Sequence, residues 1–366
     1  MIIGIPRSRV SDEYRVGLPP RMAGNLVRQG WTVLVEKNAG AGSGFPDAHY
    51  ERVGADICHQ ADEVWGRAEL ILKVNTLARA EYDLVRPGQI LMSVFHLAVA
   101  DRKMLERLLE IGCTVIDYVT IEDDLGRLPV LRPLSQIAGR MVPQIAARYL
   151  QTDHGGTGIL LGGAPAVPPA EVTIIGAGTV GRNAVRACLG AGARVTLLDS
   201  DLDRIAELDW MFPGRVTTYP ANEATISKVF AFANVVVGAV LVPGTRTPHL
   251  VTRPMVGLLR PGSLVIDISV DQGGCFATSR PTRLSDPTYV VDGVTHYCVP
   301  NLPSLVARSA SYAMANAAMP YVQMVAEGSL SDEATMPADL RRGVNIQGGR
   351  IRHAGLAGIM GLEDPS

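Results

Sequence analysis

Long apolar runs are missing from this sequence. The longest, such as residues 235–242, fall far short of a membrane span and contain glycine. The first residues, Met-Ile-Ile-Gly-Ile-Pro, lack the charged segment and the long apolar stretch of a signal peptide. We therefore expect a cytoplasmic protein with no membrane partner.

An excess of charge and a pattern of paired cysteines are missing as well. The chain has 34 Lys and Arg residues against 36 Asp and Glu residues, a formal net charge of -2. This balance does not favour binding to nucleic acids. The odd number of cysteines includes no CxxC pair, so we expect reduced thiols and no metal site. The cysteines are Cys58, Cys113, Cys188, Cys275 and Cys298.

Strand and helix patterns alternate along the first third of the chain. With 366 residues, 47% of them hydrophobic, the chain is long enough for two domains. Strands separated by helices predict a parallel sheet in a first α/β domain. Strands are predicted at residues 1–5, 31–36, 70–74, 90–94 and 114–116, and helices at 20–29 and 101–111.

A helical spacing of apolar residues follows from Ser135, which would serve as N-cap, with Pro143 expected to kink or break the helix. A link rich in Gly and Pro covers residues 155–169. A second series of strands and helices then occupies residues 172–299. A helix near 309–326 and a polar tail end the chain.

The second series opens with Gly176-Ala-Gly178-Thr-Val-Gly181, which follows an apolar strand and precedes a helix. In this dinucleotide-binding pattern the first glycine makes a tight turn, the second admits the pyrophosphate, and the third permits close helix packing. Asp199 ends the next strand, where a carboxylate accepts hydrogen bonds from ribose hydroxyls and repels a 2′-phosphate. The pattern predicts NAD as the cofactor; glycines used only for turns are the alternative.

A second glycine-rich stretch, Gly40-Ala-Gly42-Ser-Gly44, also follows a strand. Here Phe45-Pro46-Asp47 interrupts any immediate helix, so the stretch lacks the helix N-terminus that a phosphate needs. We interpret it as a loop.

Several stretches resemble the alanine dehydrogenase family, in collinear order from residue 1 to about 325. They are Asp12-Glu-Tyr-Arg15-Val-Gly-Leu, residues 35–45, residues 135–141, residues 240–244, Val270-Asp271-Gln-Gly-Gly-Cys275, Ser279-Arg-Pro-Thr and His296-Tyr-Cys-Val-Pro-Asn301. Part of the pattern is also similar to nicotinamide nucleotide transhydrogenase.

The resemblance implies an α/β protein of two doubly wound Rossmann-like domains with an active-site cleft between them. Residues 1–130 and 305–366 would form the substrate domain, and residues 131–304 the NAD-binding domain. It also implies a homo-oligomer, commonly a hexamer. The reaction implied is hydride transfer between NAD and Cα of an amino acid, giving an imine that water converts to a 2-oxo acid and ammonia.

The resemblance gives three residues chemical roles. Arg15 would hold the substrate carboxylate with its guanidinium fork, the alternative being a surface ion pair with Glu13 or Asp12. His96, at the end of a predicted strand, would be the general acid/base, unless it is a core histidine. Asp271 would act beside the nicotinamide ribose and the reacting carbon, unless it is a solvated loop carboxylate. Further cofactor contacts are expected at Thr179, Val180, Ser135, Leu241, Val299 and Asn301.

The substrate pocket departs from the family pattern. Asn75 stands where the family has a lysine that contacts the substrate, Val119 and Gln136 stand where it has glutamates, and Arg132 is an additional cation. Losing a cation together with nearby acids keeps a buried site close to neutral. We expect Asn75 and Arg132 to contact a small substrate other than alanine, an amino acid or 2-oxo acid. For Arg132 the alternative is a salt bridge at the surface.

The alternative is an NAD-binding protein with little or no catalysis, in a regulatory or structural role. The retention of Arg15, His96 and Asp271 together favours the enzyme.

Overall fold

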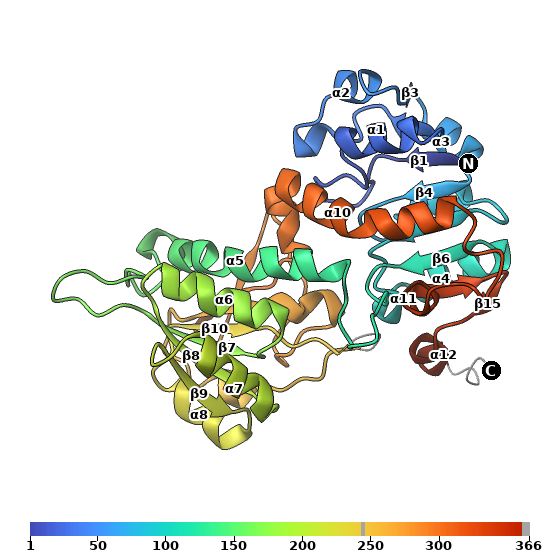
Figure 1. Ribbon diagram of the computed structural model, residues 1–366. Coiled ribbons are helices and arrows are strands. Elements are labelled where there is room, and N and C mark those ends of the chain that lie inside the picture. The colour runs from blue at the N-terminus through green and yellow to red at the C-terminus, as the bar shows by residue number, and fades with distance from the viewer. Residues whose placement is uncertain (243–245, 361–366) are drawn as a thin grey trace. The chain divides into compact units, whose positions relative to one another are not determined.

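The computed structural model describes residues 1–242 and 246–360, and divides them into two structural units (Figure 1). Unit 1 contains residues 1–134 together with the chain from 303 onward. Unit 2 contains residues 135–242 and 246–302. Each unit has its own sheet, in the order expected of a doubly wound α/β fold. The predicted fold class is therefore confirmed.

The sheet of unit 1 has eight strands in the order β15-β14-β6-β5-β4-β1-β2-β3. The six strands from β6 to β3 are parallel, and the order reverses between β1 and β4. Ligands of such sheets bind beyond the carboxyl ends of the strands at this reversal. The strands are β1 (Ile2–Ile5), β2 (Thr32–Glu36), β3 (Asp56–Cys58), β4 (Leu70–Leu72), β5 (Ile90–Ser93), β6 (Thr114–Asp117), β14 (Val344–Gln347) and β15 (Arg350–Ile351).

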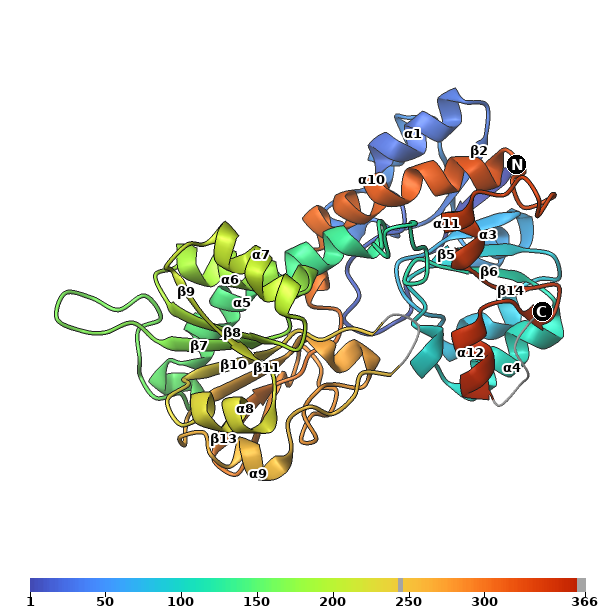
Figure 2. The same ribbon diagram turned by 60° about the horizontal axis from the view of Figure 1, so that its bottom comes forward.

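Helices cover both faces of this sheet, with α1 and α10 on one side and α4 and α12 on the other (Figures 1 and 2). A buried cluster that includes Trp65, Leu91 and Leu105 packs α3 and α4 on the strands. The helices are α1 (Pro20–Arg28), α2 (Asp47–Glu51), α3 (Ala61–Arg67), α4 (Arg102–Ile111), α10 (Ala307–Ala326), α11 (Ala338–Gly343) and α12 (Ala354–Met360), with 3-10 turns η1 (Ala41–Ser43), η2 (Arg79–Leu84), η3 (Leu97–Val99) and η6 (Leu302–Val306).

The sheet of unit 2 has seven strands in the order β12-β13-β11-β10-β7-β8-β9, and its order reverses between β7 and β10. All its pairs are parallel except the edge pair of β12 and β13. The strands are β7 (Glu171–Ile175), β8 (Arg194–Asp199), β9 (Val216–Pro220), β10 (Val235–Gly238), β11 (Leu264–Asp267), β12 (Thr288–Val291) and β13 (Val294–Tyr297).

Helices α5 and α6 lie on one face of this sheet and α8 and α9 on the other (Figures 1 and 2). Helix α5 approaches α6 so closely that a Cβ on Gly139 would clash with the carbonyl oxygen of Val180. The helices are α5 (Leu131–Tyr149), α6 (Thr179–Gly190), α7 (Leu202–Met211), α8 (Glu223–Phe230) and α9 (Arg253–Val256), with 3-10 turns η4 (Thr152–His154) and η5 (Ile268–Gln272).

The structure differs from the local predictions at three places. Helix α5 begins at Leu131, so Ser135 lies inside it and is not its N-cap. The helix also continues through Pro143, so this proline does not break it. The tail beyond residue 326 forms α11, β14, β15 and α12, and β14 pairs antiparallel with β6, so the first sheet is not purely parallel.

Each of the five cysteines is a free, buried thiol. Across the described ranges, no helix combines the length and the apolar character needed to cross a membrane. The same residues include no group of three or more His, Cys, Asp or Glu that could hold a metal ion.

Candidate active site

The candidate substrate residues of unit 1 all follow neighbouring parallel strands at their carboxyl ends. Arg15 lies beyond β1, Asn75 beyond β4 and His96 beyond β5, and β6 ends with Asp117. The segment with Arg15 passes so close to β4 that a Cβ on Gly17 would clash with the carbonyl oxygen of Leu72. These side chains therefore lie at the point in the sheet where α/β proteins bind ligands.

Arg15 forms a buried ion pair with Glu13. Its Nε donates to one carboxylate oxygen of Glu13 at 2.7 Å and its Nη2 to the other at 2.5 Å. The exposed fractions of the two side chains are 1% and 0%. The alternative to substrate binding was an ion pair of Arg15 at the protein surface. The ion pair with Glu13 does form, but it is buried and does not lie at the surface. A substrate carboxylate that reaches Arg15 has to share this guanidinium with Glu13.

Asn75 contributes an uncharged donor to the same cluster. Its Nδ2 donates to Glu13 at 3.2 Å, and its side-chain oxygen accepts from the backbone amide of Thr76 at 2.8 Å. Lys73 does not replace the missing cation, because its ammonium pairs with buried Glu81 at 2.5 Å. The cluster of Glu13, Arg15 and Asn75 thus carries one buried charge of each sign.

His96 occupies a left-handed backbone conformation, with φ at 50° and ψ at 49°. This region is uncommon for residues other than glycine and often marks functional sites. Its Nδ1 atom is buried and has no hydrogen-bond partner among the described residues. A buried polar atom without a partner is exceptional, and here one ring nitrogen of His96 has an unused hydrogen-bonding capacity among the described residues.

The loop with His96 is held by Asp117. One oxygen of this carboxylate accepts from the amide of Phe95 at 3.0 Å, and the other from that of Leu97 at 3.3 Å. Burial raises the pKa of Asp117, while the nearby imidazole of His96 and the backbone amides oppose this shift. Asp117 therefore positions His96 from both sides of the turn.

Arg132 lies in the first turn of α5, on the unit 1 side of the boundary, and its side chain is exposed. It forms no ion pair with a described carboxylate, so it is not bound in a surface salt bridge there. Val119 is buried. Within the described part of the chain, no hydrogen bond or ion pair joins Arg132 to Arg15, Asn75 or His96.

In unit 2, each glycine of the predicted dinucleotide motif has a distinct environment. Gly176 has φ at 108°, and a Cβ there would clash with the carbonyl oxygen of Ala239. A Cβ on Gly181 would clash with the carbonyl oxygen of Gly176. A Cβ on Gly178 would meet no described atom within 4 Å, although its φ of -68° suits any residue. Gly178 therefore keeps an open space at the N-terminus of α6, as a bound pyrophosphate requires.

Asp199 lies beside this turn at the end of β8. Its carboxylate accepts from the amide of Ala177 at 2.5 Å and from that of Asp201 at 2.8 Å. These bonds fix both oxygens and leave each with further acceptor capacity. The carboxylate is thus fixed beside the turn between β7 and α6.

Asp271 lies in η5, directly after β11, and accepts a hydrogen bond from the backbone amide of Asn301 at 3.0 Å. Asn301 has a positive φ of 55°. The contact joins two residues that the resemblance had assigned to the same site. Both follow adjacent parallel strands, since β11 pairs with β13.

The loop with Asp271 is organised by buried Asp267. This carboxylate accepts from the amides of Ser269 and Cys275 at 2.9 Å each and from the hydroxyl of Ser279 at 2.6 Å. Burial raises the pKa of Asp267, and these hydrogen bonds oppose the shift.

The remaining predicted cofactor contacts are distributed along the ends of the unit 2 strands. Thr179 and Val180 open α6, Leu241 follows β10, and Val299 follows β13. Leu241 is exposed, Val299 is buried, and Ser135 is half-buried in α5. Pro243 and Gly244 of the quoted 240–244 motif lie outside the described residues.

Three residues of the candidate site were missed or undervalued from sequence. Glu13 was considered only as a surface partner of Arg15, and Asp117 and Asp267 were not considered. Each of these two aspartates ends a strand of the parallel sheet, which was an available signal. The segment next to Glu13 is fixed by residues far along the chain, such as Ser304, whose hydroxyl accepts from the amide of Tyr14 at 2.9 Å.

Comparison with known proteins agrees with this arrangement over the whole chain. The family model for the alanine dehydrogenase/PNT N-terminal domain matches residues 4–138, and that for the C-terminal domain matches residues 142–354. The chain is 42% identical to alanine dehydrogenase of Halomonas elongata over 363 residues, covering 99% of this chain and 98% of that one. It is 40% identical to alanine dehydrogenase of Mycobacterium tuberculosis, covering 99% and 97%.

Solved structures show the same likeness. An L-alanine dehydrogenase superposes with a TM-score of 0.92 at 41% identity, covering 99% of both chains. A transhydrogenase from Sinorhizobium meliloti shares the fold, with a TM-score of 0.77 at 24% identity over 96% of this chain and 99% of that one. This chain therefore belongs to the alanine dehydrogenase family.

Proposed function

We propose that the protein is an NAD-dependent dehydrogenase that transfers hydride between NAD and Cα of an amino acid, and that its preferred amino acid is not alanine. The observation that carries this proposal is the constellation of Arg15, His96 and Asp117 at the carboxyl-end edge of the unit 1 sheet, beyond β1, β5 and β6. Membership of a family with curated alanine dehydrogenases supports the reaction type.

The residues of unit 2 fit the cofactor. Bound NAD would supply the hydride acceptor. The first amides of α6 and the open space at Gly178 would hold its pyrophosphate, and Asp199 would accept from its adenosine ribose. Asp271, oriented by the amide of Asn301, is the carboxylate proposed to lie near the nicotinamide ribose and the reacting carbon.

The residues of unit 1 would manage the substrate and its protons. Arg15 would pair with the substrate carboxylate, while Glu13, already bound to Arg15, would attract the positively charged amino group. His96 would exchange a proton with the substrate nitrogen or with the water that attacks the imine. A buried cluster of balanced charge thus suits a zwitterionic amino acid.

Two features support a changed substrate. Asn75 brings no charge where the resemblance implies a lysine, and Val119 is apolar where it implies a glutamate. A substrate carboxylate therefore meets no second cation at position 75. Arg132 remains a proposed contact for a further acidic group of a larger substrate.

The test is a screen of amino acids for NADH formation, with NAD binding measured in parallel by titration. We expect tight NAD binding and faster turnover of some amino acid other than alanine. Efficient alanine oxidation would contradict the changed substrate while leaving the dehydrogenase intact.

A second candidate is an NAD-binding protein with little catalysis, which is favoured by the enclosed contact of Glu13 with Arg15. NAD binding without oxidation of any amino acid would support this second function. Absence of NAD binding would contradict both.

Substitution of Asn75 by lysine tests the charge balance. We expect Asn75→Lys alone to leave kcat/KM for alanine within about tenfold of the parent value, because the added cation meets a cluster that is already neutral. Val119 and Gln136 supply no acid to offset it. Steady-state kinetics on alanine, with Asn75→Gln as the uncharged control, measure this. A rise of several orders of magnitude in the lysine variant alone would show that Asn75 is the sole cause.

A further inference from the structure

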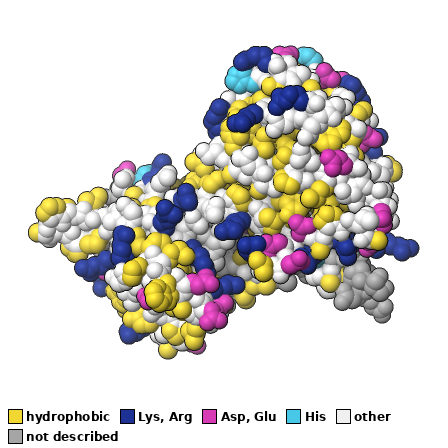
Figure 3. All heavy atoms as spheres, viewed as in Figure 1, with side chains coloured by type: hydrophobic (Ala, Val, Ile, Leu, Met, Phe, Trp, Pro, Cys, Tyr) yellow, Lys and Arg dark blue, Asp and Glu magenta, His cyan; other side chains and the backbone are white. Residues whose placement is uncertain are grey.

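Unit 1 contains a pocket that neither the cofactor nor the amino acid accounts for. It has a volume of about 290 Å³ and is formed by α1, α2 and the first turns of α10. Its lining includes Arg21, Arg28, Arg52, Arg308 and His49, and includes no carboxylate. Figure 3 shows basic side chains gathered over the end of unit 1 that carries α1 and α2.

The positive charge of this pocket is not neutralised within the described chain. None of its four arginines forms an ion pair with a described carboxylate, whereas Arg9 pairs with Glu36 at 2.6 Å. Asp47 and Glu51 belong to α2 but do not line the pocket. Guanidinium groups without a carboxylate partner give this part of the surface a positive potential, which attracts anions.

Part of the lining is already fixed in place. Nη1 of Arg308 donates to the carbonyl oxygen of Gly44 at 3.0 Å, and its guanidinium carbon lies 4.5 Å from the ring centroid of Phe45. Phe45 in turn packs edge-on against Tyr312 at 5.3 Å. Nε of Arg52 donates to the carbonyl oxygen of Ala48 at 3.2 Å. A fixed guanidinium loses less side-chain entropy when it binds an anion.

We propose that this pocket is a binding site for a small polyanion with at least two phosphate or carboxylate groups. Guanidinium forks match both groups, and several forks around one cavity select multiple charges over a single charge. The volume suits a small ligand. The site is distinct from the dinucleotide turn, because its lining comes from unit 1 and the turn belongs to unit 2.

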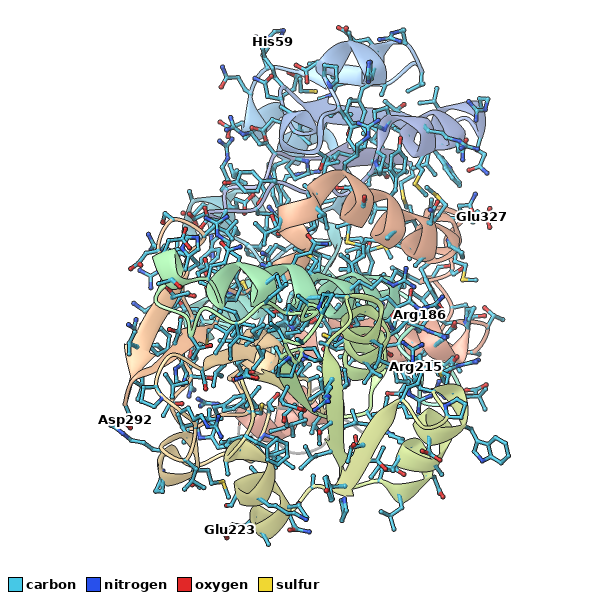
Figure 4. The ribbon with its side chains drawn as sticks, turned by 90° about the vertical axis from the view of Figure 1, so that its left-hand side faces the viewer. His59, Arg186, Arg215, Glu223, Asp292 and Glu327 are labelled. Carbon is cyan, nitrogen blue, oxygen red and sulfur yellow. The ribbon has the colours of Figure 1, made fainter. Side chains whose placement is uncertain are left out.

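The test is calorimetric titration of the full-length protein with inorganic pyrophosphate at constant ionic strength. Saturating NADH is present so that the dinucleotide turn is filled. The pocket variant is Arg21→Gln/Arg52→Gln. The matched control is Arg186→Gln/Arg215→Gln, which removes the same charge from exposed positions of unit 2 (Figure 4). We expect saturable binding to the parent and the control, and an affinity at least about tenfold lower in the pocket variant.

Circular dichroism of each variant checks folding. If the double variant fails to fold, Arg52→Gln alone takes its place, since this side chain is exposed. Three results would overturn the proposal: binding that does not saturate, an equal loss of affinity in the control variant, or a changed oligomeric mass of the pocket variant in light scattering. The last result would show that the arginines face another copy of the chain.

Discussion

At Arg15 the protein places one of its own carboxylates where a substrate carboxylate is proposed to bind. Arg15 could be identified from sequence as a candidate substrate-binding residue because the motif around it is specific. The buried pairing of Glu13 could not, because the segment around it is fixed by contacts of Tyr14 and Val16 with residues beyond 300 in the chain. A buried ion pair is costly to break by removing one partner, so Glu13 and Arg15 act as one unit.

His96 provides the most direct test of catalysis. We expect His96→Ala to lower turnover of the amino acid found in the screen by about 10²–10⁴-fold, because one proton-transfer group is lost. NAD affinity should stay unchanged, since His96 belongs to unit 1. Stopped-flow or steady-state kinetics measure turnover, and fluorescence titration measures NAD. Near-normal turnover would identify His96 as a structural residue.

Asp199 tests the choice of cofactor. We expect Asp199→Ala to weaken NAD binding by about 10–100-fold, because a hydrogen bond to a charged group contributes about 1.5–3 kcal/mol. NADP binding should weaken less or improve, since the repulsion of a 2′-phosphate is gone. Titrations with both cofactors measure the ratio. A ratio that does not change, in a variant with a parent-like melting profile, would show that Asp199 only holds the turn at Ala177 and Asp201.

At the scale of helices and strands, sequence patterns predicted the elements with strong local signals. The apolar runs of β1, β2, β5 and β6 and the spacing of α4 were predicted close to their observed bounds. Strands β14 and β15 were missed because they are short and are stabilised by non-local pairing of β14 with β6. The start of α5 was misjudged because the N-cap pattern at Ser135 is equally compatible with a helix interior.

Two glycines in the turn from β7 to α6 have different roles. Gly181 is required by the backbone packing, and Gly178 is proposed to be required by the ligand. We expect Gly178→Ala to keep the stability of the parent and to lose most NAD affinity, because its Cβ meets open space in the protein. Gly181→Ala should lower the free energy of unfolding by about 1–3 kcal/mol, because its Cβ clashes with a backbone carbonyl.

Thermal unfolding and NAD titration of the two variants measure both effects. If Gly178→Ala binds NAD as the parent does, the pyrophosphate does not lie at this turn. If Gly181→Ala is as stable as the parent, the backbone of the turn adjusts more easily than its geometry indicates.

At the scale of the whole molecule, each structural unit contains a histidine whose pKa is lowered, His296 being buried and His353 half-buried. In unit 2, burial lowers the pKa of His296, with its ring between Thr278 and the carbonyl oxygen of Val294. In unit 1, burial lowers the pKa of His353, and the nearby carboxylate of Asp117 opposes the shift. Both imidazoles are therefore favoured in the neutral form by the folded state.

This arrangement predicts a loss of stability in mild acid. A histidine with a lowered pKa in the folded state binds its proton more readily when unfolded, so stability is complete above about pH 6.5 and falls as the pH drops below it. We expect the melting temperature to decrease from pH 7.5 to 5.5, and His353→Gln to flatten that decrease. His59→Gln, at an exposed position, is the control (Figure 4). The His353 variant should melt lower than the parent at pH 7.5, since its packing is altered, but with a shallower pH dependence. An equally steep decrease in the parent, the control and the His353 variant would assign the acid sensitivity to carboxylates or to His296 instead.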